Sequence, residues 1–190
     1  MTSKPSLPVL RHSARRGGLP RGYLAGRLVG ALGYHRLAGD FRAALPELTV
    51  EPIASLARVE LVCSSGLPPS EHADVERSSE LRARLAAWTT PAVGWRRLHE
   101  VVARPTIEIR WVPGSEGLLG GIAALIRRAA DPSAVLGVTS ASGEALLWED
   151  PSPQAVAWMA DEFAAAWRRA TALPPRVYRE VASRAGAATP

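Results

Sequence analysis

The sequence predicts an α/β (or α+β) domain, with a mixed sheet covered by amphipathic helices and preceded by a basic, irregular N-terminal arm. Three observations lead to this prediction. Between residues 55 and 175, short apolar runs typical of strands alternate with longer stretches whose apolar residues recur at helical spacing. All six tryptophans follow residue 87, so the main hydrophobic core belongs to the later part of the chain. Positive charge is instead concentrated near the N-terminus.

We divide the chain into three parts. Residues 1–54 form the basic arm, which holds a glycine-spaced helix and is partly disordered. Residues 55–175 form a single α/β domain, and residues 176–190 form a frayed tail. The tail is expected to fray because Pro174 and Pro175 stop the last helix. With 47% apolar and 22% charged residues, the chain can bury an ordinary core.

The basic arm carries the strongest charge. Residues 1–42 hold eight Lys or Arg residues against one Asp, which gives +8 − 1 = +7, while the whole chain carries +5 and the remainder therefore +5 − 7 = −2. Such an arm is expected to contact a polyanion, either nucleic acid or an acidic membrane surface. The candidate contacts are Arg11, Arg15, Arg16 and Arg21. The alternative is an arginine-rich leader that is solvated and has no partner.

The first elements are predicted from turn residues and helical spacing. Proline and glycine predict an irregular course for residues 1–20. Residues 21–32 favour a helix with one apolar face, made of Leu24, Leu28, Ala31 and Leu32. Glycine recurs on this helix at Gly22, Gly26 and Gly30. These glycines fit either close tertiary packing or an interfacial amphipathic helix.

The middle of the chain predicts alternating strands and helices. Residues 58–64 are apolar and β-branched, as in a strand. Ser70 is a suitable N-cap for a helix over 70–88, and a shorter helix over 95–102 follows it. Residues 107–111 place apolar side chains at every second position, which is the period of a half-buried strand.

The last third predicts a helix, a hairpin and a second helix. Five apolar residues form a helical stripe across residues 119–129. Residues 134–139 and 144–149 are predicted as the two strands of a hairpin that turns at Gly143. Ser152 is the expected N-cap of the final helix. The buried face of that helix is predicted to carry Val156, Met159, Phe163, Trp167 and Ala170.

The histidines and the single cysteine show no catalytic or metal-binding signature. His99 and Glu100 resemble the start of a zinc-protease helix, but residue 103 is alanine, so the second ligand is missing. Cys63 ends a strand, where a nucleophile can lie, but a free cysteine is more often a small buried hydrophobe. We therefore expect no catalytic residue, no metal and no cofactor.

Two further patterns have a structural and a functional interpretation. Gly114, Gly117, Gly120 and Gly121 lie between a strand and a predicted helix, which is the context of a phosphate-binding turn. Their spacing matches neither the dinucleotide fingerprint nor the P-loop. These glycines are candidate ligand-binding residues, or they serve only the turn and its packing. Paired arginines are predicted as solvated helix faces rather than as DNA-reading helices, at Arg82/Arg84, Arg96/Arg97 and Arg127/Arg128.

The order of elements over residues 101–173 resembles the phospholipase-D-like C-terminal domain of TrmB-type transcriptional regulators. The resemblance is carried by the strand Ile107-Glu-Ile-Arg-Trp-Val-Pro, by Ala145-Leu-Leu-Trp at the end of the hairpin, and by the segment Phe163-Ala-Ala-Ala-Trp of the final helix. It implies a domain that senses small molecules or supports dimerisation beside a winged helix. This chain has neither a readable winged helix nor a His-x-Lys catalytic signature, because Lys4 is its only lysine. No site residue is carried over.

The leading hypothesis is a non-enzymatic regulatory or effector-type domain that acts through a partner. That partner is nucleic acid bound by the arm, another protein or a second copy of the chain. One alternative is a small ligand-binding protein or enzyme that uses the glycine-rich turn 114–121. Another is a structural interaction subunit that docks through residues 21–33. We expect a cytoplasmic location, since no disulfide is possible and no apolar run approaches the roughly 20 residues that span a bilayer.

Overall fold

The computed structural model describes residues 10–14, 21–39, 41–64, 94–112, 122–139 and 145–187. Within them, one eight-stranded sheet has the order β1-β7-β6-β5-β2-β3-β4-β8. The strands are β1 Leu10–Ala14, β2 Gly33–Ala38, β3 Arg58–Ser64, β4 Ile107–Val112, β5 Ile122–Arg127, β6 Ser133–Thr139, β7 Ala145–Asp150 and β8 Thr171–Ala172. The helices are α1 Arg21–Leu28, α2 Phe41–Leu48, the 3-10 helix η1 Glu51–Ser55, α5 Trp95–Val102, α6 Pro153–Arg169 and α7 Pro175–Ala187.

The sheet is mixed, as predicted. Strands β2, β3 and β4 run parallel to one another, and β5 joins β2 in the antiparallel direction. Strands β6, β7 and β1 extend the antiparallel side, while the short β8 pairs with β4 at the opposite edge. Parallel neighbours need a crossover connection, which α2 and η1 supply between β2 and β3.

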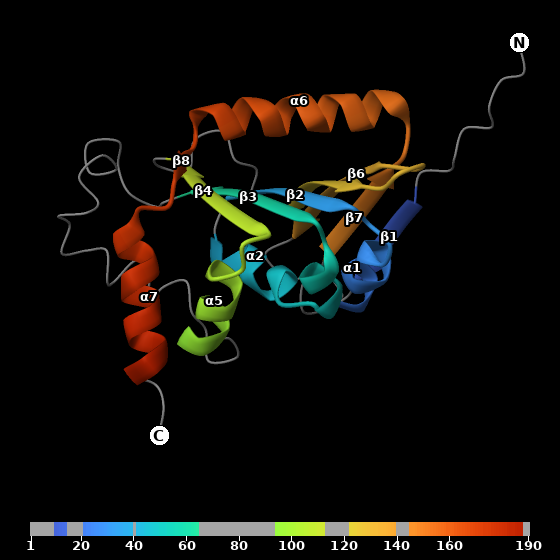
Figure 1. Cartoon of the computed structure of the whole chain (residues 1–190). Coiled ribbons are helices and arrows are strands. Elements are labelled where there is room, and N and C mark those ends of the chain that lie inside the picture. Colours follow the sequence, from blue (N-terminus) through green and yellow to red (C-terminus); the bar gives the residue numbers. More distant parts are fainter. Residues whose placement is uncertain are drawn as a thin grey trace, which may run out of the picture.

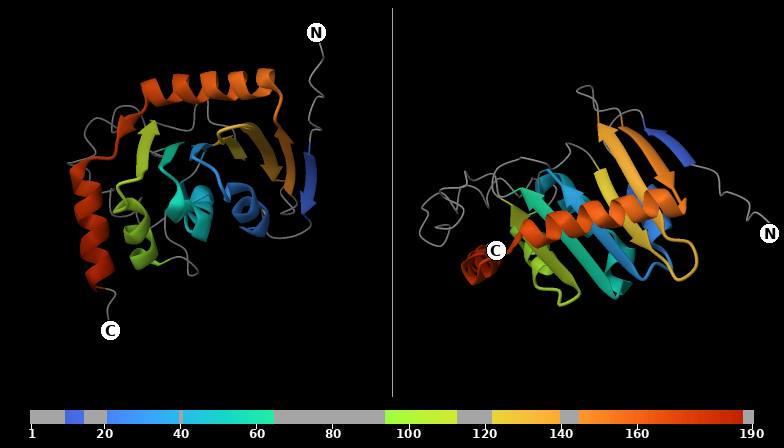
Figure 2. Two further views of the ribbon diagram at one scale, coloured as in Figure 1. Left: turned by 45° about the vertical axis from the view of Figure 1, so that its right-hand side comes forward. Right: turned by 90° about the horizontal axis from the view of Figure 1, so that it is seen from above.

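The described helices cover both faces of the sheet. Helix α6 lies across one face, α1, α2 and α5 lie on the other, and α7 packs beside α5 (Figure 1). Seen from above, α6 runs obliquely over the strands (Figure 2). Side chains alternate along each strand, so the central strands contribute to two apolar clusters. The cluster beneath α6 includes Val62, Leu125 and Phe163, and the larger cluster on the opposite face includes Leu61 and Ile126.

Several elements with strong local signals are confirmed. The predicted strand 58–64 is β3, the helix over 95–102 is α5, and the two hairpin strands are β6 and β7. Helix α6 begins at its expected cap, because the Ser152 hydroxyl accepts a hydrogen bond from the Ala155 N–H at 3.3 Å. The helix predicted over 70–88 lies outside the described residues.

The helix predicted across residues 119–129 is wrong in its described part. Residues 122–127 form β5, which pairs with β2 on one side and with β6 on the other. Leu125 belongs to the cluster beneath α6 and Ile126 to the larger cluster, so the strand is apolar on both faces. A short continuous apolar run fits a helical stripe as well as a doubly buried strand, and only the neighbouring strands decide between them.

Both ends of the chain hold more regular structure than the sequence patterns predict. Residues 10–14 form the edge strand β1 instead of an irregular segment. Residues 33–48, which we assign to the arm from the sequence, contain the interior strand β2 and helix α2. The tail predicted to fray forms α7, in which Val177 is fully buried. Each of these elements gains its burial from residues that are distant in the sequence.

The glycine-spaced helix predicted over residues 21–32 corresponds to α1, which ends earlier, at Leu28. A Cβ atom at Gly26 would meet nothing within 4 Å, so close packing against the described residues does not require that glycine. Gly30 follows the helix with φ of +72°, a left-handed conformation that glycine adopts readily. Leu24 and Leu28 are buried as expected, but Leu32 lies beyond the helix and is 55% exposed. None of the described helices combines the length and apolar character needed to cross a membrane.

Candidate functional site: a pocket between helix α6 and the sheet

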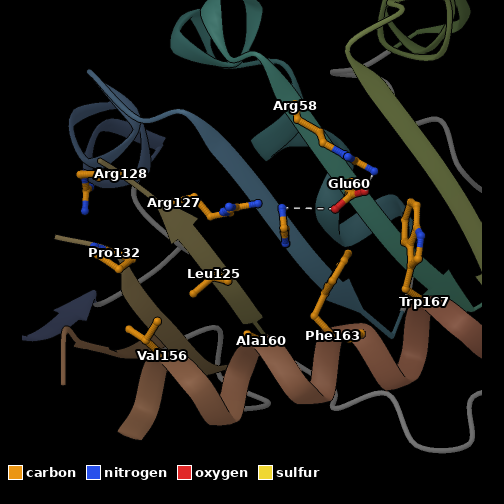
Figure 3. Close-up of a pocket in the computed structure, with 12 residues that line it drawn as sticks. Arg58, Glu60, Leu125, Arg127, Arg128, Pro132, Val156, Ala160, Phe163 and Trp167 are labelled. Carbon is orange, nitrogen blue, oxygen red and sulfur yellow. Dashed lines mark ion pairs between the residues drawn. The ribbon is translucent and has the colours of Figure 1, made fainter. Parts of the chain in front are cut away.

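A pocket of about 540 Å³ lies between α6 and strands β2, β3 and β5 (Figure 3). This volume falls within the usual range for small-molecule sites. The polar part of its lining comes from the sheet and the turn after β5, and consists of His35, Arg58, Glu60, Arg127 and Arg128. The apolar part comes mainly from α6, and consists of Leu125, Pro132, Val156, Ala160, Phe163, Ala164 and Trp167.

Strand register places the polar side chains next to one another. Gly33 of β2 pairs with Arg58 on one side and with Arg127 on the other. Two residues further along β2, and therefore on the same face, His35 pairs with Glu60. Gly33 has no side chain, so no β2 side chain separates the two arginines. A Cβ atom built there would lie 3.2 Å from the Arg58 carbonyl oxygen, which is a tight contact.

His35 lies at the centre of the pocket floor. Its Nε2 atom lies 3.2 Å from Glu60 Oε2, yet the buried Nε2 has no partner in hydrogen-bond geometry. Burial lowers the pKa of His35, Glu60 opposes that change, and Arg127 and Arg58 add to the lowering. His35 is therefore neutral near pH 7 and offers an unsatisfied polar atom inside the pocket.

The three arginines of the lining differ in how far their charge is neutralised. Arg58 forms an ion pair with Glu60. Arg128 donates hydrogen bonds to the Arg27 carbonyl oxygen and to the Ser133 hydroxyl, and one of its nitrogens lies 3.8 Å from a Glu149 oxygen. Arg127 makes no ion pair or hydrogen bond with the described residues, and Figure 3 shows its side chain directed along the pocket. Because Arg27 and Arg128 share the single Glu149 carboxylate, positive charge exceeds negative charge around the pocket.

Aromatic side chains of α6 form the opposite wall. The Phe163 ring lies with its centroid 4.7 Å from that of His35 and 5.5 Å from that of Trp167. Trp167 is in turn fixed by Arg110, whose guanidinium carbon lies 4.1 Å from the centre of the indole ring. Glu108 accepts a hydrogen bond from Arg110 at 2.9 Å and holds that guanidinium in place. The apolar wall is thus preformed in the structure.

A buried carboxylate links the pocket rim to α1. Glu149 of β7 accepts hydrogen bonds from the Tyr23 and Ser133 hydroxyls, both at 2.6 Å, and from Arg27. Burial would raise the pKa of Glu149, but the hydrogen bonds from Arg27, Ser133 and Tyr23 outweigh burial and lower it. Arg128 lies beside the same carboxylate, so the charge at the pocket rim and the position of α1 depend on one another.

None of the predicted site residues is among the described residues that line the pocket. Arg11 lies in β1 and Arg21 opens α1, but the placement of their side chains is outside what the structure describes. Arg15, Arg16 and the glycines between 114 and 121 lie outside the described residues altogether. Cys63 is fully buried, with its sulfur 3.7 Å from the Arg110 carbonyl oxygen. No three metal-ligating side chains of the described residues lie close enough to hold an ion.

Sequence reasoning missed the pocket for two identifiable reasons. Strand β2, which carries His35, was not predicted, because the polar His35 and Arg36 interrupt its apolar run. The pair Arg127/Arg128 was noticed but assigned to a solvated helix face, whereas both residues end or follow β5 and line the pocket. Strand spacing would place Gly33, His35 and Leu37 on one face, but apolar and polar residues do not alternate across residues 33–38, so the sequence offers no clear strand signal there.

Comparison with protein-family models and with curated protein sequences found no match. Among solved structures, Nuc, a phospholipase D family member from Salmonella typhimurium, matches with a TM-score of 0.52 and 12% identity, covering 87% of this chain and 97% of Nuc. NucT from Helicobacter pylori matches with a TM-score of 0.46 and 13% identity, covering 87% of this chain and 100% of NucT. TrmBL2, described as an archaeal chromatin protein with a novel mode of DNA binding, matches with a TM-score of 0.46 and 12% identity over 90% of this chain.

At these identities the likeness concerns the fold alone, and the chain spans only 56% of the length of the TrmBL2 chain. The Nuc superposition nevertheless covers most of both chains. The chain therefore has a phospholipase-D-like fold, in agreement with the resemblance that the sequence of residues 101–173 shows.

Proposed function

We propose that this chain is a non-enzymatic regulatory domain of the effector type, which binds a small ligand in the pocket beneath α6 and a nucleic acid through its basic arm. The observation that carries the proposal is the composition of the pocket. A preformed aromatic wall faces an uncompensated guanidinium and a neutral histidine, which suits binding and orientation of a ligand. The described lining holds no serine, threonine, cysteine or lysine, and its two side chains that could act as a nucleophile or base, His35 and Glu60, lie 3.2 Å from one another.

The charge of the arm supports the nucleic-acid contact. Among the described side chains of segment 1–42, Arg27 pairs with Glu149 and the buried Arg36 pairs with Glu47 at 2.9 Å. The other positive residues of the segment include the candidate contacts Arg11, Arg15, Arg16 and Arg21. Side chains of this type neutralise backbone phosphates without reading the base sequence.

The described contacts also provide a connection between the pocket and the arm. β1 pairs with β7, and the Glu149 carboxylate of β7 holds α1 through Tyr23 and Arg27. Arg128 of the pocket rim donates a hydrogen bond to the Arg27 carbonyl oxygen of α1. A ligand that draws Arg128 towards itself would change the support of α1, which immediately follows the arginines of the arm.

The test is nonspecific duplex DNA binding over a salt series. We compare the unmodified full chain with a variant in which Arg11, Arg15, Arg16 and Arg21 are all replaced by glutamine. If each arginine neutralises one phosphate, the slope of log K against log salt should become shallower by about 0.9 per residue, or roughly 3.6 in total. The matched control replaces four arginines of the other end of the chain by glutamine, namely Arg168, Arg169, Arg176 and Arg179. Equal slopes for the two variants, or no DNA binding by the unmodified chain, would contradict the arm's role.

A structural interaction subunit is the second candidate, favoured by exposed apolar residues next to α1. Val29 is 69% exposed and Leu32 is 55% exposed, and both lie just beyond the helix. Gly26→Leu tests this function, because a Cβ atom at that position meets no described atom within 4 Å and the fold is expected to stay intact. Loss of self-association or of a co-purifying protein in that variant would favour this function over the effector function.

A phosphate site at the glycine-rich turn 114–121 stays a prediction, which thermal shifts with phosphorylated ligands would test.

A further inference from the structure

We infer that the pocket beneath α6 is a binding site for a small aromatic carboxylate, with the carboxylate on Arg127 and the ring against the α6 wall. This inference names the ligand class of the site in the proposed function, and it rests on that function only for its regulatory consequence. The assignment of a ligand follows from three properties of the lining, which are its charge, its unsatisfied polar atom and its aromatic wall.

The charge of the lining specifies the head group. Arg58 is paired with Glu60, and Arg128 lies 3.8 Å from Glu149, so Arg127 supplies the one guanidinium without a partner among the described residues. The planar donors of this guanidinium bind a carboxylate through two parallel hydrogen bonds. A doubly charged phosphate monoester would place more negative charge close to the Glu60 carboxylate. We therefore assign a carboxylate as the head group.

The floor of the pocket provides the space and the second polar contact. Gly33 lies between Arg58 and Arg127 in the sheet, so no side chain of β2 separates these two arginines. His35, in the next row on the same face, has its buried Nε2 without a hydrogen-bond partner. An unsatisfied buried polar atom is costly, and a ligand carboxylate oxygen relieves this cost when the hydrogen is on Nε2 and the side chains that cover the atom move aside. A carboxylate on Arg127 brings its oxygens towards this part of the floor.

The wall of the pocket specifies the body of the ligand. Phe163 and Trp167 present two rings 5.5 Å apart, and Arg110 already fixes the second of them. Leu125 and Val156 complete an apolar surface on the β5 side. A flat ring placed there buries apolar area and forms aromatic contacts with Phe163. The volume of about 540 Å³ accommodates one or two fused rings together with the head group.

The test is isothermal titration calorimetry of the full chain with benzoate, phenylacetate and 1-naphthoate, and with 1-naphthamide and 1-naphthyl phosphate as matched probes. We expect at least one carboxylate to bind, and 1-naphthamide to bind more weakly than 1-naphthoate. Arg127→Gln should weaken carboxylate binding about tenfold to 100-fold, the range of a charge-assisted hydrogen bond, and should leave 1-naphthamide unchanged. Arg169→Gln, which replaces an exposed arginine outside the pocket, should change neither.

A second variant tests the position of the ligand without changing the charge of the pocket. Ala164 lines the pocket from the exposed side of α6, so Ala164→Trp should fill part of the volume and weaken the carboxylate and the amide alike. The inference is overturned if no carboxylate binds at millimolar concentration, if 1-naphthyl phosphate binds more tightly than 1-naphthoate, or if Arg127→Gln and Arg169→Gln have the same effect. The two proposals fail separately. Carboxylate binding that leaves DNA affinity unchanged removes the effector function but keeps the site, whereas arginine-dependent DNA binding without carboxylate binding removes the site alone.

Discussion

At the scale of single residues, His35 shows how a pocket can be lined by a histidine that carries no charge. Desolvation has the largest effect on the pKa of His35 and lowers it. Arg127 and Arg58 also lower this pKa, while Glu60, at 3.2 Å, raises it. The Phe163 ring packs against the imidazole and contributes to the burial. The neutral form is therefore held by its surroundings on both the sheet side and the helix side.

The lowered pKa of His35 predicts a defined pH dependence of stability. The unfolded chain titrates this residue near pH 6.5, and the folded chain titrates it at a lower pH. Between those two values the unfolded state binds more protons, so the free energy of unfolding should fall as the pH is lowered through this window. Above the pKa of His35 in the unfolded state, this residue does not make the free energy of unfolding depend on pH.

Urea denaturation between about pH 5 and pH 8 measures this dependence, because that range brackets histidine titration. His35→Gln should make the free energy of unfolding less dependent on pH below about 6.5. The matched control is His99→Gln, which changes a histidine of α5 outside the pocket. A slope in His35→Gln as steep as in the unmodified chain would show that another group causes it.

At the scale of single elements, α6 is stabilised both by an N-cap at its first turn and by a side chain buried against the sheet. The Ser152 hydroxyl satisfies one of the free N–H groups at the start of the helix. Phe163, eleven positions further along, is only 5% exposed and packs into the cluster beneath α6. The cap sets where the helix begins, and the buried side chain fixes the helix on the sheet.

The Ser152 cap and the buried Phe163 side chain are expected to contribute unequally to the free energy of unfolding. Ser152→Ala should lower the free energy of unfolding by about 1 kcal/mol, which is typical for loss of an N-cap. Phe163→Ala should lower it by about 3–5 kcal/mol, because the cavity adds to the lost transfer free energy. Glu162→Ala is the exposed control on the same helix and should change stability by less than about 0.5 kcal/mol. Equal effects of the Ser152 and Phe163 substitutions in urea denaturation would contradict this account of α6.

At the scale of the whole molecule, β2 decides whether the sheet exists as one unit. It lies between β5 and β3, and so joins the parallel half of the sheet to the antiparallel half. It also carries Tyr34, which is fully buried in the larger cluster and donates a hydrogen bond to Glu47 at 2.8 Å. We therefore expect that the first 54 residues cannot be removed without loss of the fold.

Truncation gives a direct test of this role. A chain that starts at Pro46 lacks β2 and should lose cooperative thermal unfolding and amide dispersion in NMR, because β3 and β5 then lose a shared neighbour. Removal of residues 1–9, which precede β1, is the matched control and should retain both properties. A folded, cooperatively unfolding chain from Pro46 onward would show that β2 is dispensable.

The sequence by itself determined the elements whose signals are local. Strand β3, strand β4, the β6–β7 hairpin, helix α5 and the Ser152 cap all follow from periodicity and cap or turn residues within a few positions. These signals arise from side chains that are neighbours in the chain. For the same reason, the fold class and the mixed character of the sheet could be predicted from the order of these elements.

Only the tertiary structure decided the assignment of β5, the interior position of β2, the helix α7 and the pocket. The apolar run of β5 fits two secondary structures, and its neighbours β2 and β6 select the strand. The candidate site depends on the same contacts, because His35, Glu60 and Arg127 come from three different strands that only the sheet register brings together. Side chains far apart in sequence become neighbours through burial of apolar surface, and no local pattern records which distant partner covers which face.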